Sequence, residues 1–128
     1  YWGYMIDHIS LNVSDITTSK EFYLKALEPL GYKTHMEMPE WNLLGLGREK
    51  PDFWILAAGC KQTTHLAFTA DSKEMVDAFH QAGVAAGGKD NGAPGYRKEY
   101  SPGYYGAFVL DPDGHNLEAV YDDTNPSE

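Results

Sequence analysis

Two histidines occupy matching places in the two halves of this 128-residue sequence. The segment 7–12 (DHISLN) aligns with the segment 64–69 (THLAFT), so His65 follows His8 by 57 positions. Glu118 belongs to a third alternating segment near the end of the chain. Two imidazoles and one carboxylate are a ligand set for an open site that binds iron, manganese, zinc or nickel. If their strands meet on one surface, we expect His8, His65 and Glu118 to hold one divalent metal ion.

The alternation of polar and apolar residues places further polar groups beside His8. Between residues 5 and 13, Ser10 and Asn12 fall on the same face as His8, while the apolar side chains fall on the other face. We expect Ser10 and Asn12 to hydrogen-bond a small substrate. The alternative for His8 is a strand histidine that bonds within the fold, and for Glu118 it is a carboxylate in a salt bridge at the rim.

Three larger side chains are candidates for the wall of a binding pocket. Concave sites are lined by aromatic groups with few polar ones, so we expect Trp54 and Tyr105 to contact a substrate. Aromatic residues on strands also pack in cores, and this alternative stays open for both. Arg97 lies in the glycine-rich segment 87–103 and is the expected anchor for an anionic group. A solvated loop arginine is the alternative for Arg97.

The first half of the chain predicts one strand, one helix and three further strands. Ser14 and Asp15 are favourable helix N-caps, and Pro29 with Gly31 ends the helical pattern. The strands around this helix are expected at 5–13, 32–38, 41–46 and 53–57.

The second half repeats this order with a less regular middle. Asp71 followed by Glu74 resembles a capping box at the start of the second helix. Segment 87–103 holds five Gly and two Pro and predicts a long loop with at most a short strand. The tetrapeptide 111–114 (DPDG) is a turn signal, after which His115 is expected at the surface. The strands are expected at 64–70, 105–110 and 115–121.

This order predicts an α+β fold built from two paired βαβββ modules that form a curved mixed sheet around a cleft. We expect a single domain over residues 1–128, with module one at about 5–60 and module two at about 63–122. Each helix covers one face of its own sheet, and the polar faces then point into the cleft.

Composition narrows the classes of partner. The net charge of −9 argues against nucleic acid and against anionic membrane surfaces, and no run of about 20 apolar residues is present. Cys60 is the single cysteine, so no intrachain disulfide is expected, which is typical of a cytoplasmic protein. Residues 1–4 precede Met5 without a basic or long apolar segment, so we expect an extension there rather than a secretory signal.

The chain resembles the vicinal oxygen chelate superfamily, which includes glyoxalases, bleomycin-resistance proteins and extradiol dioxygenases. The resemblance covers essentially residues 5–122, and it implies paired βαβββ modules, a site for a small molecule in the curved sheet and often a homodimer. The matching segments are Ile6 to Asp15, Glu21-Phe22-Tyr23 ahead of Leu30-Gly31, Thr64 to Phe68, and Asp111 to Glu118.

The resemblance also implies a ligand set. The family has four positions that can supply metal ligands, and three of them match here at His8, His65 and Glu118. The fourth falls at Trp54, which cannot bind a metal, so glyoxalase I activity is not expected. The resemblance implies a metal-dependent enzyme for a small molecule, with lyase, isomerase or dioxygenase chemistry through a chelated oxyanion or enolate. The alternative is a non-catalytic binding protein of the bleomycin-resistance type.

Overall fold

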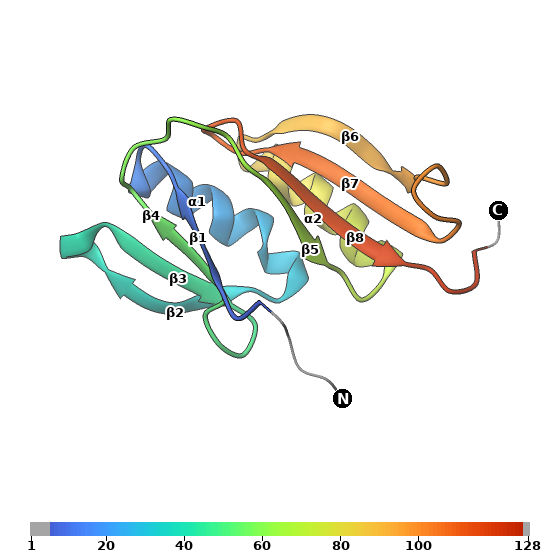
Figure 1. Ribbon diagram of the computed structural model, residues 1–128, viewed down its shortest axis with the longest axis horizontal. Helices are drawn as coiled ribbons and strands as arrows, with labels where there is room; N and C mark the ends of the chain where they lie inside the picture. Colours follow the sequence, from blue (N-terminus) through green and yellow to red (C-terminus); the bar gives the residue numbers. More distant parts are fainter. Residues whose placement is uncertain (1–5, 127–128) are drawn as a thin grey trace.

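The structure is a computed structural model that describes residues 6–126 (Figure 1). The prediction that residues 1–4 are an extension lies outside the described residues. No helix within residues 6–126 has the length and apolar character needed to cross a membrane.

The first module is a four-stranded mixed sheet with one long helix. Its strands lie in the order β1-β4-β3-β2, and β1 is parallel to β4. The elements are β1 (Ile9–Asn12), α1 (Ile16–Ala26), the 3-10 helix η1 (Glu28–Leu30), β2 (Lys33–Met38), the 3-10 helix η2 (Pro39–Trp41), β3 (Leu43–Gly47) and β4 (Phe53–Leu56).

The second module repeats this topology. Its strands lie in the order β5-β8-β7-β6, and β5 is parallel to β8. The elements are β5 (His65–Thr69), α2 (Lys73–Ala85), β6 (Lys89–Tyr96), β7 (Tyr104–Leu110) and β8 (Asn116–Asp122). The predicted α+β fold of two βαβββ modules is therefore confirmed.

Both helices begin where a side chain caps the first turn. The Asp15 carboxylate accepts a hydrogen bond from the Thr17 amide at 3.1 Å, as the sequence predicted for α1. In α2 the cap is Ser72, whose hydroxyl accepts from the Met75 amide at 3.2 Å, one residue later than the predicted Asp71.

The strand register places the two modules in correspondence. Ser10 of β1 pairs with Trp54 of β4, and Ala67 of β5 pairs with Glu118 of β8. Ala67 follows Ser10 by the same 57 positions that separate the two histidines. Trp54 and Glu118 are therefore equivalent positions of the repeat.

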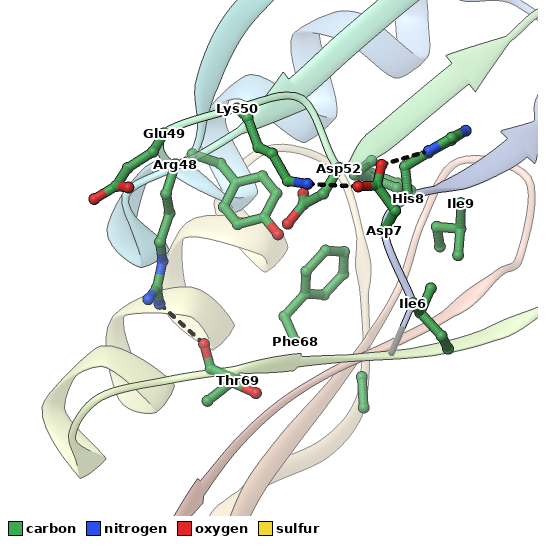
Figure 2. A pocket seen from close by; sticks show the side chains of 13 residues that line it. Ile6, Asp7, His8, Ile9, Arg48, Glu49, Lys50, Asp52, Phe68 and Thr69 are labelled. Carbon is green, nitrogen blue, oxygen red and sulfur yellow. Dashed lines mark hydrogen bonds and ion pairs between the residues drawn. The ribbon is translucent and has the colours of Figure 1, made fainter. Parts of the chain in front are cut away.

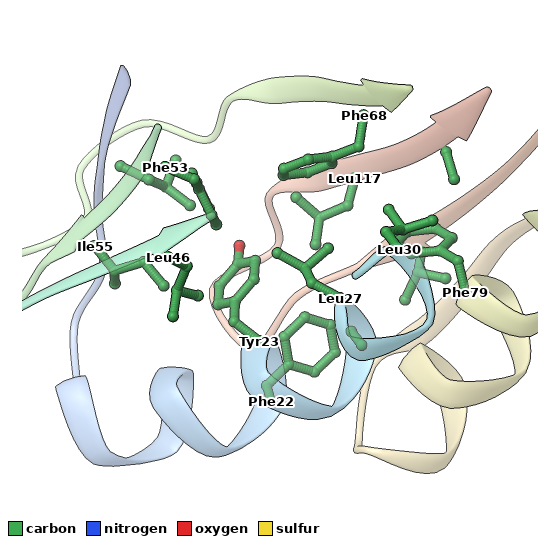
Figure 3. Packing of buried hydrophobic residues seen from close by; sticks show 14 of the residues in the cluster. Phe22, Tyr23, Leu27, Leu30, Leu46, Phe53, Ile55, Phe68, Phe79 and Leu117 are labelled. Carbon is green, nitrogen blue, oxygen red and sulfur yellow. The ribbon is translucent and has the colours of Figure 1, made fainter. Parts of the chain in front are cut away.

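The hydrophobic core lies between the helices and the sheets and runs through both modules (Figure 3). The Tyr23 ring of α1 contacts the Phe53 ring edge-on at a centroid distance of 5.2 Å, and Phe53 in turn contacts Phe68 of the second module at 5.3 Å. Helices α1 and α2 also pack against each other. Because the apolar faces turn toward the helices, the polar faces of β1 and β5 are left exposed.

The prediction for segment 87–103 was wrong in one respect. Residues 89–96 form the eight-residue strand β6, where a loop with at most a short strand was expected. β6 pairs only with β7 at the edge of the sheet, so the missing N–H of Pro94 interrupts no second ladder. The register shifts on both sides of Gly92, which lets an irregular glycine-rich segment remain paired.

Candidate functional site

Glu118 lies at the centre of the second sheet, and it is a buried carboxylate with two partners. Only 2% of its surface is exposed. One carboxylate oxygen, Oε1, lies 3.0 Å from Nε2 of His65. The other oxygen, Oε2, accepts a short hydrogen bond from the hydroxyl of Tyr104. A buried polar group without such partners would be strongly destabilising, so His65 and Tyr104 offset the cost of burying this carboxyl group.

The spacing of the His65–Glu118 pair fits one metal ion. Ligand atoms bound at about 2.0–2.2 Å lie about 3 Å apart at the 90° angles of an octahedral ion and about 3.4 Å apart in the tetrahedral geometry of zinc. The 3.0 Å between Nε2 and Oε1 is therefore close to the octahedral spacing. His65 is half exposed, so the pair is accessible from the outer face of the sheet. The donor set of one nitrogen and one carboxylate oxygen also suits iron, manganese and nickel.

Tyr104 controls the second oxygen of Glu118. Burial, and next the hydrogen bond to Glu118, raise the pKa of the Tyr104 hydroxyl to about 12. The hydroxyl therefore keeps its proton at neutral pH and acts as a donor. Because Oε2 is occupied in this way, Glu118 presents a single oxygen, Oε1, on the side of His65.

His8 lies apart from that pair and contacts the carboxylate of Asp7. Its Nδ1 lies 2.9 Å from Oδ1 of Asp7, and the other Asp7 oxygen accepts a hydrogen bond from Lys50 at 2.7 Å. The hydrogen bonds from Lys50 and then His8 lower the pKa of Asp7. A carboxylate on one ring nitrogen fixes the imidazole tautomer and directs the other nitrogen outward, as metal-binding histidines require. The His8 side chain is 55% exposed.

A single chain does not bring His8 to His65 and Glu118. Among residues 6–126, one group of three potential ligands has its atoms within 4.8 Å of one another, and that group is Asp111, Asp113 and His115. Within one chain, His65 and Glu118 are therefore in contact, and His8 lies apart from them.

The pocket at the His65–Glu118 pair has a volume of about 430 Å³ and a mostly aromatic wall. The Phe108 ring stacks with the His65 ring at a centroid distance of 6.2 Å. The guanidinium of Arg97 lies over the same Phe108 ring at 5.4 Å, so Phe108 stands between this predicted residue and His65, and Arg97 does not line the pocket. The lining residues are His65, Tyr100, Tyr104, Phe108, Asn116 and Glu118.

Tyr105 is placed on the other side of β7. Its hydroxyl donates to Asp77 of α2 at 2.7 Å, so the neighbouring Tyr104 lines the pocket in its place. The sequence indicated this orientation. Ala107 and Val109 lie on the same face of β7 as Tyr105, and they are apolar residues suited to the side that faces the helix. Four residues line the pocket that were not among the substrate-binding residues expected from the sequence: Tyr100, Tyr104, Phe108 and Asn116.

The other predicted binding residues belong to the first sheet. Ser10 and Asn12 are exposed on β1. Trp54 lies over Gly45 of β3, where a Cβ atom would come within 2.7 Å of the indole ring. These three residues share the outer face of the first sheet and do not line the pocket at Glu118.

A second hollow of about 490 Å³ lies where the first module meets β5 (Figure 2). Its charged groups contact other parts of the chain. Lys50 reaches Asp7, and Arg48 donates to the backbone oxygens of Leu30 at 2.7 Å and Thr69 at 3.0 Å. The bond from Arg48 to Thr69 joins the two modules, so this side of the hollow contributes to the packing of the chain.

The Asp111–Asp113–His115 cluster is occupied by hydrogen bonds within the chain. Asp111 accepts from the backbone amide of His115 at 2.8 Å and from the buried hydroxyl of Tyr23 at 2.5 Å. The imidazole of His115 accepts from the Thr64 amide at 2.9 Å through Nδ1, and its Nε2 donates to the Asn12 oxygen at 3.0 Å. These bonds use both ring nitrogens and connect the modules.

The surface position expected for His115 was therefore wrong. The residue is 1% exposed. Its partners Asn12 and Thr64 are 103 and 51 residues distant in sequence, so the local turn signal could not reveal its burial.

Comparison with known proteins places this geometry in a family. The family model described as "Glyoxalase/Bleomycin resistance protein/Dioxygenase superfamily" matches residues 5–119. The uncharacterized protein YqjT of Bacillus subtilis (strain 168) is 31% identical over 134 residues, covering 88% of this chain and 95% of that protein.

Solved structures give the same result. A glyoxalase/bleomycin resistance protein from Albidiferax ferrireducens T118 has a TM-score of 0.77 and 31% identity, covering 92% of this chain and 98% of that chain. A lactoylglutathione lyase from Agrobacterium tumefaciens has a TM-score of 0.68 at 18% identity, covering 91% and 92% respectively, and this likeness shows the fold alone. The chain belongs to the glyoxalase/bleomycin resistance protein/dioxygenase superfamily.

Proposed function

We propose that the protein is a metal-dependent enzyme for a small molecule, with a site that is completed when two copies of the chain associate. The observation that carries the proposal is the buried Glu118 carboxylate with Nε2 of His65 at 3.0 Å. His8 of the second copy is the third ligand. The proposal thereby includes the homodimer that the family resemblance implies.

The exposed faces of the chain support this pairing. His8, Ser10 and Asn12 project from the first sheet, while His65 and Ala67 project from the second. A twofold dimer that lays the first sheet of one copy against the second sheet of the other contains two identical sites. Each site then combines His8 from one copy with His65 and Glu118 from the other.

The roles of the residues follow from their chemistry. His65, Glu118 and His8 would hold a divalent ion, which would supply Lewis-acid chemistry to adjacent oxygens of a substrate. Tyr104 keeps a proton on the far side of Glu118. Ser10 and Asn12 donate hydrogen bonds to the substrate from the facing sheet.

Metal analysis after reconstitution tests this proposal. We expect about one zinc, iron, manganese or nickel ion per chain in the wild type and a loss of that ion in His65→Ala. The matched control is His80→Ala. His80 lies on α2 and pairs with Asp90 of β6, away from the pocket. A wild type that binds no divalent ion, or a His65→Ala variant that keeps it, would overturn the proposal.

A non-catalytic binding protein is the second candidate. The observations that favour it are the aromatic wall of the pocket and the indole of Trp54 at the position equivalent to Glu118. The two candidates differ in one result. A binding protein retains its affinity for small molecules when Glu118 is changed to Gln, whereas a chelating enzyme loses it.

A further inference from the structure

Asn91 lies at an irregular place in strand β6, at the outer edge of the second sheet (Figure 1). The register of β6 against β7 shifts between Asp90 and Gly92, which leaves Asn91 without a partner in this ladder among the described residues. Asn91 is also exposed. A residue outside the ladder at a sheet edge keeps more freedom to change its backbone angles than its paired neighbours.

The backbone amide of the next residue, Gly92, donates to a carboxylate in its own strand. Its acceptor is Oδ1 of Asp90 at 2.9 Å, and Nε2 of His80 lies 2.9 Å from the same oxygen. The contact with His80 and then the bond from Gly92 lower the pKa of Asp90, so this carboxylate is ionised at neutral pH. The Gly92 amide therefore faces a group that can accept its proton.

The side chain of Asn91 reaches the wall of the pocket at Glu118. Its Nδ2 donates to Oδ1 of Asn116 at 3.1 Å. Asn116 lines that pocket and pairs in register with His65. The Asn91 amide is thus separated from the His65–Glu118 pair by a single side chain, and a change in its charge alters the surroundings of the pocket.

We propose that Asn91 is a site of spontaneous deamidation. The Gly92 nitrogen attacks Cγ of Asn91, and the bond between Cγ and Nδ2 breaks, which forms a cyclic imide. The amide proton passes to Asp90 and returns through water to the departing nitrogen, which leaves as ammonia. Water then opens the imide at either carbonyl and gives aspartate or isoaspartate. Glycine favours the attack because it has no Cβ atom to hinder its nitrogen.

A second pair, Asp113 and Gly114, could form the same imide but is held by the fold. The Gly114 amide donates to the backbone oxygen of Asp111 at 2.9 Å. The carboxylate of Asp113 accepts hydrogen bonds from Ser14, from the hydroxyl at 2.5 Å and from the amide at 3.2 Å. Both reacting groups of this pair are bound to fixed partners, so we expect the reaction at Asn91 and not at Asp113.

Deamidation changes the charge beside the pocket. The neutral amide that donates to Asn116 becomes a carboxylate, which adds one negative charge to a chain of net charge −9. Asn116 then has to turn its own amide group toward this carboxylate, and the wall of the pocket changes with it. The reaction needs no metal, so it is independent of the proposed function.

Peptide mapping by mass spectrometry after incubation of the full chain at neutral pH tests the site. Three asparagines that are exposed like Asn91 serve as internal controls, because they precede valine, leucine and proline: Asn12, Asn42 and Asn125. We expect the mass increase at Asn91 to be at least about tenfold faster than at these positions, whose following residue hinders or lacks the attacking N–H. An isoaspartate assay on the same peptides should detect isoaspartate at position 91 and none at Asp113.

Asp90→Ala tests the proton acceptor and should slow the deamidation of Asn91 by at least about threefold. The matched control is His80→Ala, which leaves Asp90 beside Gly92 and should keep the rate within about twofold, because ion pairs at the surface contribute little. An unchanged rate in Asp90→Ala overturns the role of Asp90. Equal rates at Asn91 and Asn12, or equal isoaspartate at positions 91 and 113, overturn the site itself.

Discussion

Trp54 in the first sheet and Glu118 in the second stand at equivalent places of the duplicated fold and have different partners. Trp54 pairs in register with Ser10 and covers Gly45 with its ring. Glu118 pairs with Ala67, and its oxygens face His65 and Tyr104. The backbone register is the same in both modules. One position of the repeat therefore serves packing in the first module and holds a buried carboxyl group in the second, without any change of topology.

The largest expected difference between the modules is in metal affinity. Glu118→Gln removes the carboxylate charge and should lower metal affinity by more than about 100-fold, because a direct ligand is lost. Trp54→Phe changes the equivalent residue of the first module and should alter metal affinity less than about threefold. Competition titration with a chelating dye measures both. Similar losses of metal affinity in the two variants would contradict the assignment of metal binding to Glu118 and not to Trp54.

In the first module we expect a change near Trp54 to affect the stability of the fold rather than metal affinity. Gly45→Ala places a methyl group 2.7 Å from the Trp54 ring and should lower the free energy of unfolding by about 2 kcal/mol, as overpacking does. Urea unfolding measures this change. Adding Trp54→Leu should recover part of the stability, and an unchanged unfolding midpoint in Gly45→Ala would contradict the packing role of the indole.

Removing the hydroxyl that holds Glu118 should have a moderate effect. Tyr104→Phe frees Oε2 and should weaken metal binding by about tenfold, the usual effect of losing a group that orients a ligand. The matched control is Tyr105→Phe, whose hydroxyl bonds Asp77 on α2 instead. Isothermal titration with zinc compares the two, and equal effects would remove Tyr104 from the site.

The smallest expected effect is on alkaline stability. The pKa of Tyr104 is raised to about 12 in the folded chain, above its ordinary value of about 10 in the unfolded chain. The folded state therefore keeps a proton that the unfolded state releases, so this contribution is complete below pH 10 and is lost as the pH rises through about 12. Unfolding curves at pH 9, 10 and 11 should show a shallower decline for Tyr104→Phe than for the wild type, and identical slopes would contradict this assignment.

The repeat and most of its elements could be predicted from the sequence because they depend on local patterns. Alternation in 7–12 and 64–69 sets the strand faces, and Asp15 caps α1 through an amide two residues away. The alignment of residues 53–56 with residues 117–120 predicted that Trp54 is equivalent to Glu118, and the strand register confirms this equivalence. These features need only the strand period and short-range hydrogen bonds.

The remaining features depend on groups that are distant in the sequence. His115 is buried by partners from β1 and from the start of β5. β6 is a strand because β7 offers it a pairing edge, although its glycines and Pro94 predict a loop. The choice between Tyr104 and Tyr105 follows from which face of β7 meets α2. The separation of His8 from Glu118 within one chain follows from how the two modules pack, which no local pattern around either residue reveals.

Metal analysis of mixed variants tests most directly whether two copies share the site. His8→Ala and Glu118→Gln should each bind no metal alone. Refolded together in equal amounts, half of the dimers contain one copy of each and have one intact site, so the mixture should recover about one quarter of the wild-type metal. A mixture that stays free of metal, or a His8→Ala protein that binds a full equivalent by itself, would contradict a site built from His8 of one copy and the His65–Glu118 pair of the other.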